Sequence, residues 1–385
     1  MKVLVAPDKF KGSLSASEVA DRLAEGLAAA GVDSYRMPLA DGGDGSVDAA
    51  IAAGFTPRPV TVAGAAGTPR YGRIAVGHGT AVVEVADTCG LTTLPNARKL
   101  PLDASSLGMG QAISQAMRYR PRRLVLALGG SASTDGGMGL LAALGYTFAD
   151  AAGRRLRACG RSLGQVHTVD SSRATKFSGI HIVVAGDVTN PLLGPDGAAA
   201  VYGPQKGATD EEVRFLDTGL NNLVQAFARS GYPHAMAAAN TAGAGSAGGM
   251  GFAASVLGAE IVSGADYFLD LLEFDRHLPG CDLVVAGEGS IDEQTANGKL
   301  PTVVARRSYP VPVVAVAGRS TLSPSRWRAT GFTDIHALGD YTDRDTTDDP
   351  DLTRRLLTRI GRQIGCAAAY RPGVVVDDKQ SDVRR

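Results

Sequence analysis

Five short apolar runs, each followed by glycine or proline and then by a polar loop, constrain the fold of this chain more than any other feature. They lie at residues 3–6, 124–128, 182–185, 283–286 and 313–317. Their length and their valine, leucine and isoleucine content predict buried parallel β-strands. Helical patterns lie between and after them, at residues 15–29, 105–117, 137–144, 210–228, 300–307 and 351–369. This alternation predicts a doubly wound α/β sheet, which binds ligands at the carboxyl ends of its strands.

Two segments depart from this alternation. Residues 57–93 show alternating polarity and turn signals such as Gly77-His-Gly79, and they predict antiparallel β structure. The charged segment 371–385 has no helical period, which predicts a frayed tail at residues 373–385. Because no repeat and no low-complexity linker divides the chain, we expect its domains to be interleaved.

Charge and cysteine content exclude several classes of protein. The chain has 39 basic and 39 acidic residues, so no global field favours nucleic acid or an anionic membrane surface. It contains no apolar run of about 18 residues, the length that a membrane span requires. The four cysteines lie far apart without a C-x-x-C pair, which argues against a zinc site and against a disulfide framework. We therefore expect a protein of the reducing cytoplasm.

The loop Asp8–Ser13 follows the first predicted strand and precedes a predicted helix. Ser15 and Glu18 form a Ser-x-x-Glu capping box at the start of that helix. The free N–H groups and positive dipole end of a helix attract anions, so Lys9 and Lys11 beside them predict an anion cradle. The alternative is an ordinary capped helix with two solvated lysines.

Two further loops combine glycine with polar side chains. Asp41-Gly-Gly-Asp-Gly-Ser46 carries two carboxylates that could bind a divalent metal or orient a hydroxyl, although a capped turn would look the same. The loop 129–137 follows a strand and precedes a helix, and its small hydroxyl side chains and exposed amides suit phosphate oxygens.

Three more loops are candidates. After the strand at 182–185, Asp187 and Asn190 are possible metal or hydroxyl ligands, and Lys206 lies in the turn 203–207. The segment 243–248 matches the dinucleotide pattern G-x-G-x-x-G, but residues 235–240 before it do not form a strand pattern. A phosphate or carboxylate loop is therefore favoured over a nicotinamide site there.

The loop 287–299 is the densest polar constellation. It follows a predicted buried strand and precedes a helix that Pro301 helps to start. Glu288 and Asp292 are candidate ligands for a metal or a substrate, and Lys299 is a candidate phosphate partner.

The motifs that are missing narrow the chemistry. No Walker A pattern, no H-x-x-x-H and no G-x-S-x-G is present, and the six histidines avoid all of these loops. Lysine, carboxylate, hydroxyl and backbone N–H groups remain. These are the groups of phosphoryl transfer, in which magnesium and amides neutralise phosphate charge while an aspartate orients the attacking hydroxyl.

Taken in order, the loops resemble those of the bacterial glycerate kinases of the glycerate 2-kinase type. The matching pieces are residues 6–13, 40–45, 129–137, 187–192, 203–207, 243–251 and 287–299. The resemblance implies ATP-dependent phosphorylation of D-glycerate. It also implies a flavodoxin-like doubly wound domain built from residues 1–58 and 279–372, an α/β domain inserted at 59–278, and a cleft between the two.

From this resemblance we expect Mg²⁺-bound ATP to present its γ-phosphate to the C2 hydroxyl and to give 2-phospho-D-glycerate. Asp187 is the leading candidate to orient that hydroxyl, with Asp292 and Lys11 as further catalytic candidates. Asp187 and Glu288 are the candidate metal ligands. The remaining substrate- or phosphate-binding candidates are Asp8, Lys9, Ser13, Asp41, Gly130, Ser131, Ser133, Asp135, Asn190, Lys206, Gly245, Ser246, Glu288, Thr295 and Lys299.

Three alternatives remain open at this point. The product could be 3-phosphoglycerate, the substrate could be another small hydroxy acid, or the chain could be a non-catalytic nucleotide- or metabolite-binding protein. Two positions also depart from the family pattern: Lys9 stands where serine is expected, and Ser290 where arginine is expected. We hypothesise a compensating exchange, in which a cation lost from one strand end reappears on another strand of the same sheet.

Overall fold

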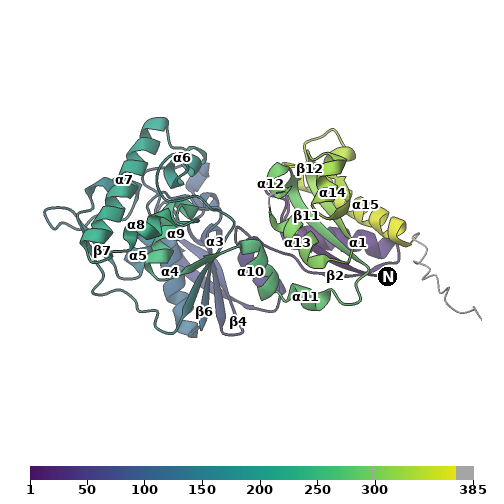
Figure 1. The fold of residues 1–385 in the computed structure, drawn as a ribbon, viewed down its shortest axis with the longest axis horizontal. Coiled ribbons are helices and arrows are strands. Elements are labelled where there is room, and N and C mark those ends of the chain that lie inside the picture. Colours follow the sequence, from purple (N-terminus) through teal and green to yellow (C-terminus); the bar gives the residue numbers. More distant parts are fainter. Residues whose placement is uncertain (297, 370–385) are drawn as a thin grey trace, which may run out of the picture.

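The computed structural model describes residues 1–296 and 298–369, and it contains two large sheets (Figure 1). The first sheet is parallel throughout and takes strands from both ends of the chain, in the order β2-β1-β11-β12-β13. Its strands are β1 (Lys2–Pro7), β2 (Asp33–Arg36), β11 (Leu283–Ile291), β12 (Val313–Ser320) and β13 (Phe332–Ala337). Numbered along the chain, these strands follow the flavodoxin order 2-1-3-4-5. The predicted fold class is confirmed.

The second sheet is mixed and is inserted between β2 and β11. Its order is β10-β9-β6-β5-β4-β3, and β7 and β8 form a separate antiparallel pair. The strands are β3 (Thr56–Ala63), β4 (Pro69–Gly77), β5 (Thr80–Glu84), β6 (Arg123–Ala127), β7 (Thr147–Ala149), β8 (Thr168–Asp170), β9 (His181–Ala185) and β10 (Glu260–Val262). The pairs β3–β4 and β4–β5 are antiparallel, whereas β5, β6, β9 and β10 run parallel.

The antiparallel prediction for residues 57–93 is confirmed for β3 to β5 and is wrong beyond them. Residues Val85–Cys89 form helix α3, and Leu91–Thr93 form a 3₁₀ turn. Val85, Thr88 and Cys89 are all buried, and their i, i+3, i+4 spacing puts them on one face of a helix but on both faces of a strand. Their spacing therefore favours a helix over a strand.

Helices cover both sheets. Their bounds are α1 (Ala16–Ala29), α2 (Ser46–Ala52), α3 (Val85–Cys89), α4 (Leu107–Ala116), α5 (Met138–Ala143), α6 (Ala198–Tyr202), α7 (Asp210–Arg229), α8 (Ala235–Asn240), α9 (Ser246–Val256), α10 (Gly264–Leu271), α11 (Phe274–His277), α12 (Glu293–Ala296), α13 (Leu300–Ser308), α14 (Pro324–Ala329) and α15 (Pro350–Ala369). The capping box of Ser15 and Glu18 is present at the start of α1. Among the described residues, no helix has the length and apolarity needed to cross a membrane.

We call the first sheet with α1 and α12–α15 the first lobe, and the second sheet with α3–α9 the second lobe. The two lobes stand side by side with α10 at their junction (Figure 1). One hydrophobic core joins them, because it combines Ala286 of β11 and Ala185 of β9 with Phe268 of α10 and Val47 of α2. The residue limits predicted for the two domains stay a prediction, and the predicted tail at 373–385 lies outside the described residues.

Candidate active site

The strand order of the first sheet reverses direction between β1 and β11. The backbone N–H of Asp8 donates to the carbonyl oxygen of Gly287 (2.8 Å), which holds the ends of these two strands together. Asp8 follows β1, and Glu288 lies near the carboxyl end of β11. In a doubly wound sheet ligands bind at this switch point. Two carboxyl groups therefore lie where the topology predicts a ligand.

Asp8 is a buried carboxyl group with a perturbed pKa. Its side chain accepts a hydrogen bond from the Lys9 backbone N–H (2.7 Å), and the Lys9 ammonium lies 3.7 Å away. Burial raises the pKa of Asp8 to about 7; the Lys9 ammonium opposes the rise, whereas Asp41 and Glu288 add to it. A buried carboxyl group whose pKa is raised to near neutrality by its surroundings is typical of a functional site.

Lys9 connects Asp8 to the loop Asp41–Ser46. Its ammonium lies 3.7 Å from Asp8 and 4.0 Å from Asp41. Burial lowers the pKa of Lys9, but the surrounding carboxylates, Asp8 first among them, outweigh this effect and raise the pKa above its ordinary value. Lys9 therefore stays charged among acidic groups.

The loop Asp41–Ser46 packs directly on the second sheet. Gly42 has a φ of +84°, and a Cβ there would lie 2.1 Å from the carbonyl oxygen of Ala185 at the end of β9. Only glycine satisfies both the conformation and the contact. The carboxylate of Asp41 accepts a hydrogen bond from the Gly43 N–H (2.9 Å). The loop thus carries Asp41 to the carboxyl ends of the second sheet.

Glu84, which the sequence interpretation missed, fixes the start of α2. Its carboxylate accepts hydrogen bonds from the N–H groups of Gly45 (3.0 Å) and Val47 (2.9 Å). Glu84 is 3% exposed, and burial raises its pKa to about 8. A signal was present, because Glu84 is the one carboxylate in the otherwise apolar run 81–86.

Asp187 extends the acidic group beyond the end of β9. Its carboxylate accepts a hydrogen bond from the Gly264 N–H at the start of α10 (2.9 Å), and the Ser263 hydroxyl lies at 3.5 Å. Burial, followed by the charge of Asp41, raises the pKa of Asp187 to about 6. Since Asp41 acts electrostatically on Asp8, Asp187 and Glu288, these carboxylates share one region between the two sheets.

The loop 129–137 is shaped by two buried ionisable side chains. The carboxylate of Asp135 accepts hydrogen bonds from the Ser106 N–H and hydroxyl (both 2.8 Å) and from the N–H groups of Gly137 (3.1 Å) and Gly139 (3.2 Å). Burial still raises the pKa of Asp135 above its ordinary value. These bonds hold the carboxyl end of the loop against Ser106, the residue before α4. Ser106 is a second residue that sequence reasoning missed.

Lys206 enters the same loop from the turn Pro204–Lys206. Its ammonium donates to the Ser131 hydroxyl (2.8 Å) and to the Ser133 carbonyl oxygen (2.6 Å). The side chain is 2% exposed, and burial lowers its pKa to about 8. These contacts make Lys206 a support of the predicted phosphate loop. Direct contact with a phosphate stays a prediction.

The glycine-rich segment 243–251 packs against the same loop. Residues Ala235–Asn240 before it form helix α8, which confirms that no strand precedes the dinucleotide pattern. The Gly136 N–H donates to the Gly248 carbonyl oxygen (3.0 Å), and a Cβ at Gly248 would lie 2.1 Å from the Ser133 carbonyl oxygen. The glycines therefore allow close packing of two backbones.

Three predicted residues near this segment make local contacts. The Gly245 N–H donates to the Asn190 carbonyl oxygen (3.0 Å), and the Ser246 hydroxyl donates to the Gly243 carbonyl oxygen (2.7 Å). The Asn190 amide donates to the Asp196 carbonyl oxygen (2.8 Å). These bonds fold the segments 187–196 and 243–251 against each other.

The loop 287–299 gathers most of its predicted residues. The Lys299 ammonium lies 3.5 Å from Glu288 and 3.9 Å from Asp292, and the Thr295 hydroxyl donates to Glu288 (3.1 Å). Burial raises the pKa of Glu288, whereas Lys299 and Thr295 oppose the rise. Glu288 is therefore a half-buried and well-held carboxyl group near the carboxyl end of β11.

Lys11 and Ser13 occupy the loop after β1. Lys11 is exposed, while the Ser13 hydroxyl donates to the Thr346 carbonyl oxygen (3.2 Å) and contacts the Thr353 hydroxyl (3.2 Å). Ser13 thus connects this loop to the segment before and within α15, and Lys11 remains available to solvent or to a ligand.

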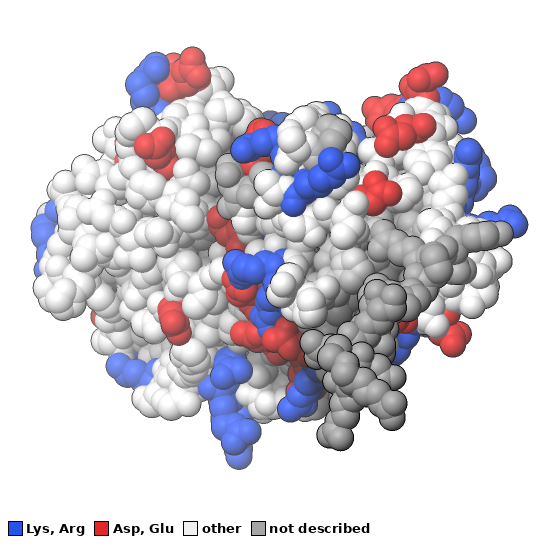
Figure 2. All heavy atoms as spheres, turned by 45° about the vertical axis from the view of Figure 1, so that its right-hand side comes forward, with Lys and Arg blue, Asp and Glu red and all other residues white. Residues whose placement is uncertain are grey.

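The donor set suits a magnesium ion that is shared with phosphate. Within the described residues, no three histidine, cysteine, aspartate or glutamate side chains are placed to hold a metal by themselves. Mg²⁺ is commonly bound by one or two carboxylates together with substrate phosphates. Asp187 and Glu288 are carboxyl groups of this kind, and the charge of Asp41 acts on both. Figure 2 shows acidic and basic side chains along the line where the lobes meet.

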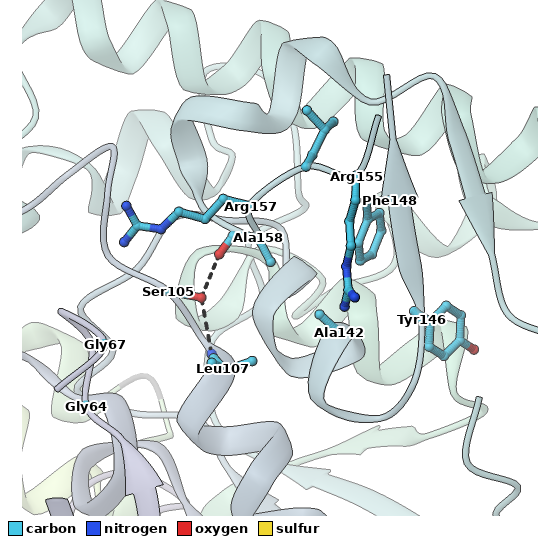
Figure 3. Close-up of a pocket in the computed structure, with 11 residues that line it drawn as sticks. Gly64, Gly67, Ser105, Leu107, Ala142, Tyr146, Phe148, Arg155, Arg157 and Ala158 are labelled. Atoms are coloured by element: carbon cyan, nitrogen blue, oxygen red, sulfur yellow. Dashed lines mark hydrogen bonds between the residues drawn. The ribbon is translucent and has the colours of Figure 1, made fainter. Parts of the chain in front are cut away.

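A separate cavity lies within the second lobe. It has a volume of about 270 Å³, and Tyr146, Phe148 and Arg155 are among the residues that line it (Figure 3). The other lining residues are Gly64, Gly67, Ser105, Leu107, Ala142, Leu156, Arg157 and Ala158. No predicted site residue lines this cavity, so the acidic region between the sheets remains the candidate active site.

Comparisons with known proteins agree with this placement of the loops. The model of the Glycerate kinase family matches residues 3–368. The chain is 38% identical over 329 residues to the glycerate kinase of Bacillus subtilis strain 168, covering 83% of this chain and 85% of the relative. It is also 38% identical over 330 residues to the glycerate 2-kinase of Escherichia coli K12, covering 83% and 86%.

A solved structure has the same fold. It is the crystal structure of a protein from Salmonella typhimurium LT2 that is provisionally assigned as glycerate kinase 2. The TM-score is 0.80 at 34% sequence identity, and the match covers 96% of this chain and 98% of the other.

Proposed function

This chain belongs to the glycerate kinase family and is a phosphotransferase, and we propose that it transfers the γ-phosphoryl group of ATP to the C2 hydroxyl of D-glycerate. The product is then 2-phospho-D-glycerate. One observation carries this proposal: Lys9 and the carboxyl groups of Asp8, Asp41, Asp187 and Glu288 converge where the strand ends of the two sheets face each other.

In the proposed reaction Asp187 accepts the proton of the attacking hydroxyl. Its pKa of about 6 keeps it ionised at neutral pH while leaving it more basic than an ordinary aspartate. The hydrogen bond from the Gly264 N–H anchors the Asp187 carboxylate to the first residue of α10. Asp187 can therefore orient the hydroxyl without moving.

The glycine loops are the proposed binding sites of the phosphates. In the loop 129–137, Gly130, Ser131 and Ser133 are the proposed phosphate contacts, and the Lys206 and Asp135 bonds described above hold them in place. Phosphoryl transfer depends mostly on such positioning, because charge spreads over the phosphate oxygens. Lys11 and Lys299 are the proposed cations at the mouth of the site.

Asp187 and Glu288 are the proposed ligands of Mg²⁺. When bound, the ion neutralises charge on the β- and γ-phosphates of ATP. Burial raises the pKa of both carboxyl groups, so a cation that favours their ionised forms would bind there with release of protons at neutral or lower pH. The cytoplasmic location predicted from the cysteines stays a prediction.

The choice of C2 over C3 is supported by the 38%-identical relative that is named a glycerate 2-kinase. Product analysis tests it. Purified protein is incubated with ATP, Mg²⁺ and D-glycerate, and the product is identified by ³¹P and ¹H NMR. We expect phosphate coupling to the C2 proton. A product phosphorylated at C3 would refute the proposed regiochemistry.

A further inference from the structure

Arg319 lies at the carboxyl end of β12, opposite Ser290 of β11. The two residues pair in the parallel register, and the Arg319 Nε–H donates to the Ser290 hydroxyl oxygen (3.3 Å). We propose that the Arg319 guanidinium binds an oxyanion of the substrates, either the carboxylate of glycerate or a phosphate of ATP, and that Ser290 orients it. This inference rests on the proposed kinase function but not on its regiochemistry.

The strand pattern places Arg319 on the face that looks toward the second lobe. Side chains two residues apart on a strand share a face. Ala286 of β11 and Ala317 of β12 both belong to the core that joins the lobes. On β11, Glu288 and Ser290 lie two and four residues after Ala286 and therefore share its face. On β12, Arg319 lies two residues after Ala317 and shares its face. The hydrogen bond between Ser290 and Arg319 confirms that these two side chains lie on the same face of the sheet.

The Arg319 guanidinium has donors to spare. A guanidinium carries five N–H donors, and its planar fork matches a carboxylate or a phosphate. Within the described part of the chain, the Arg319 side chain makes one hydrogen bond, to a neutral hydroxyl, and no ion pair. Lys9 and Lys299, two other cations at these strand ends, already contact carboxylates.

Arg319 also acts electrostatically on Asp345. The pKa of Asp345 is lowered mainly by hydrogen bonds from the Thr347 backbone and side chain, with a smaller contribution from Arg319. Thr347 also lies beside Gly12, because a Cβ on that glycine would be 3.3 Å from the threonine methyl group. Arg319 is therefore within electrostatic reach of the loop that borders the predicted anion cradle after β1.

The same contact offers an account of the missing arginine at position 290. The family pattern leads us to expect an arginine guanidinium at position 290 of β11. In this chain Arg319 of the neighbouring strand β12 places a guanidinium beside that position. The compensating cation of our sequence hypothesis was Lys9, but the recorded contacts of Lys9 are with Asp8 and Asp41, whereas Ser290 contacts Arg319. Arg319 is thus the better candidate for that exchange.

The test compares Arg319→Ser, Arg319→Lys and the exchanged double variant Ser290→Arg/Arg319→Ser. Arg214→Ser, which removes an exposed arginine from α7, is the matched control. ADP release is measured at varied glycerate and at varied ATP. We expect Arg319→Ser to raise the KM for one substrate about 10- to 100-fold with little change in kcat, which also identifies the oxyanion. Arg319→Lys should lie between this variant and the wild type.

The double variant tests whether the position of the guanidinium, and not the identity of residue 319, determines the KM. It returns a guanidinium to the same face through the register partner, so its KM should fall back to within about fivefold of the wild-type value. Ser290→Ala should raise the same KM by about two- to threefold, since it only removes the orienting hydroxyl. Arg214→Ser should change neither KM.

Unchanged KM values for both substrates in Arg319→Ser would overturn the proposal, as would a fall in kcat alone. The result is independent of the regiochemistry, because ADP release does not depend on which hydroxyl is phosphorylated. Isothermal titration with ATP and with glycerate repeats the comparison without turnover. A wild-type protein that failed to phosphorylate glycerate would therefore still report on Arg319.

Discussion

Asp187 is the residue on which the proposed phosphoryl transfer depends most directly. We expect Asp187→Asn to lower kcat more than tenfold, because an amide cannot accept the hydroxyl proton. The amide oxygen can still accept the Gly264 N–H bond, so the fold should remain intact. ADP release measures the loss of turnover, and circular dichroism checks the fold. Near-normal turnover would remove Asp187 from this role.

The pH profile gives the same residue a second signature. A general base must be ionised, and kcat/KM reports the free protein before Mg²⁺ and ATP bind, so in the wild type it should rise as the pH increases through about 6, the pKa of Asp187. The residual activity of Asp187→Asn should lack that step. If the step persists in the variant, another group, such as Asp8 with its pKa of about 7, controls it.

Among the elements, those with strong apolar patterns could be predicted, and those defined by long-range contacts could not. The five predicted strands and six predicted helices are all present, and β11 continues past residue 286 to Ile291. Strand β2 was missed, since Asp33–Arg36 is an edge strand with no buried residue. Helix α9 was hidden by Ala247, Gly248 and Gly249, all with positive φ near its start.

Helix α2 gives the prediction at this scale. Glu84→Ala removes both acceptors from the Gly45 and Val47 N–H groups, and we expect it to reduce the free energy of unfolding by roughly 2–4 kcal/mol. Because the same bonds position the loop that carries Asp41, kcat/KM should also fall. Urea unfolding and ADP release measure the two effects.

Glu84→Gln and Glu211→Gln are the controls for this helix. Glu84→Gln keeps one carbonyl acceptor and should lie between Glu84→Ala and the wild type. Glu211→Gln alters an exposed carboxylate on α7 and should change neither quantity. A Glu84→Ala protein as stable as the wild type would show that these bonds do not hold α2.

At the scale of the whole molecule, the sequence located the loops of the site but not the contacts between them. Strand ends of one parallel sheet meet at one edge, so the meeting of Asp8 and Glu288 follows from the topology. The meeting of Asp41 with Asp187 requires two sheets to face each other, which no local pattern records. The burial of Lys206 beneath the loop 129–137 has the same origin, because its partners lie more than 70 residues away.

The core shared by the lobes makes a prediction about how the molecule unfolds. Phe268 of α10 is fully buried in it, and Trp327 of the first lobe, the single tryptophan, packs against it. A common core couples the two sheets, so tryptophan fluorescence and far-ultraviolet circular dichroism should give coincident urea transitions. Phe268→Ala should lower the stability by about 3–5 kcal/mol and shift both signals together. If the fluorescence transition instead separated from the circular dichroism transition, or only one of them moved in the variant, the lobes would unfold independently and α10 would not couple them.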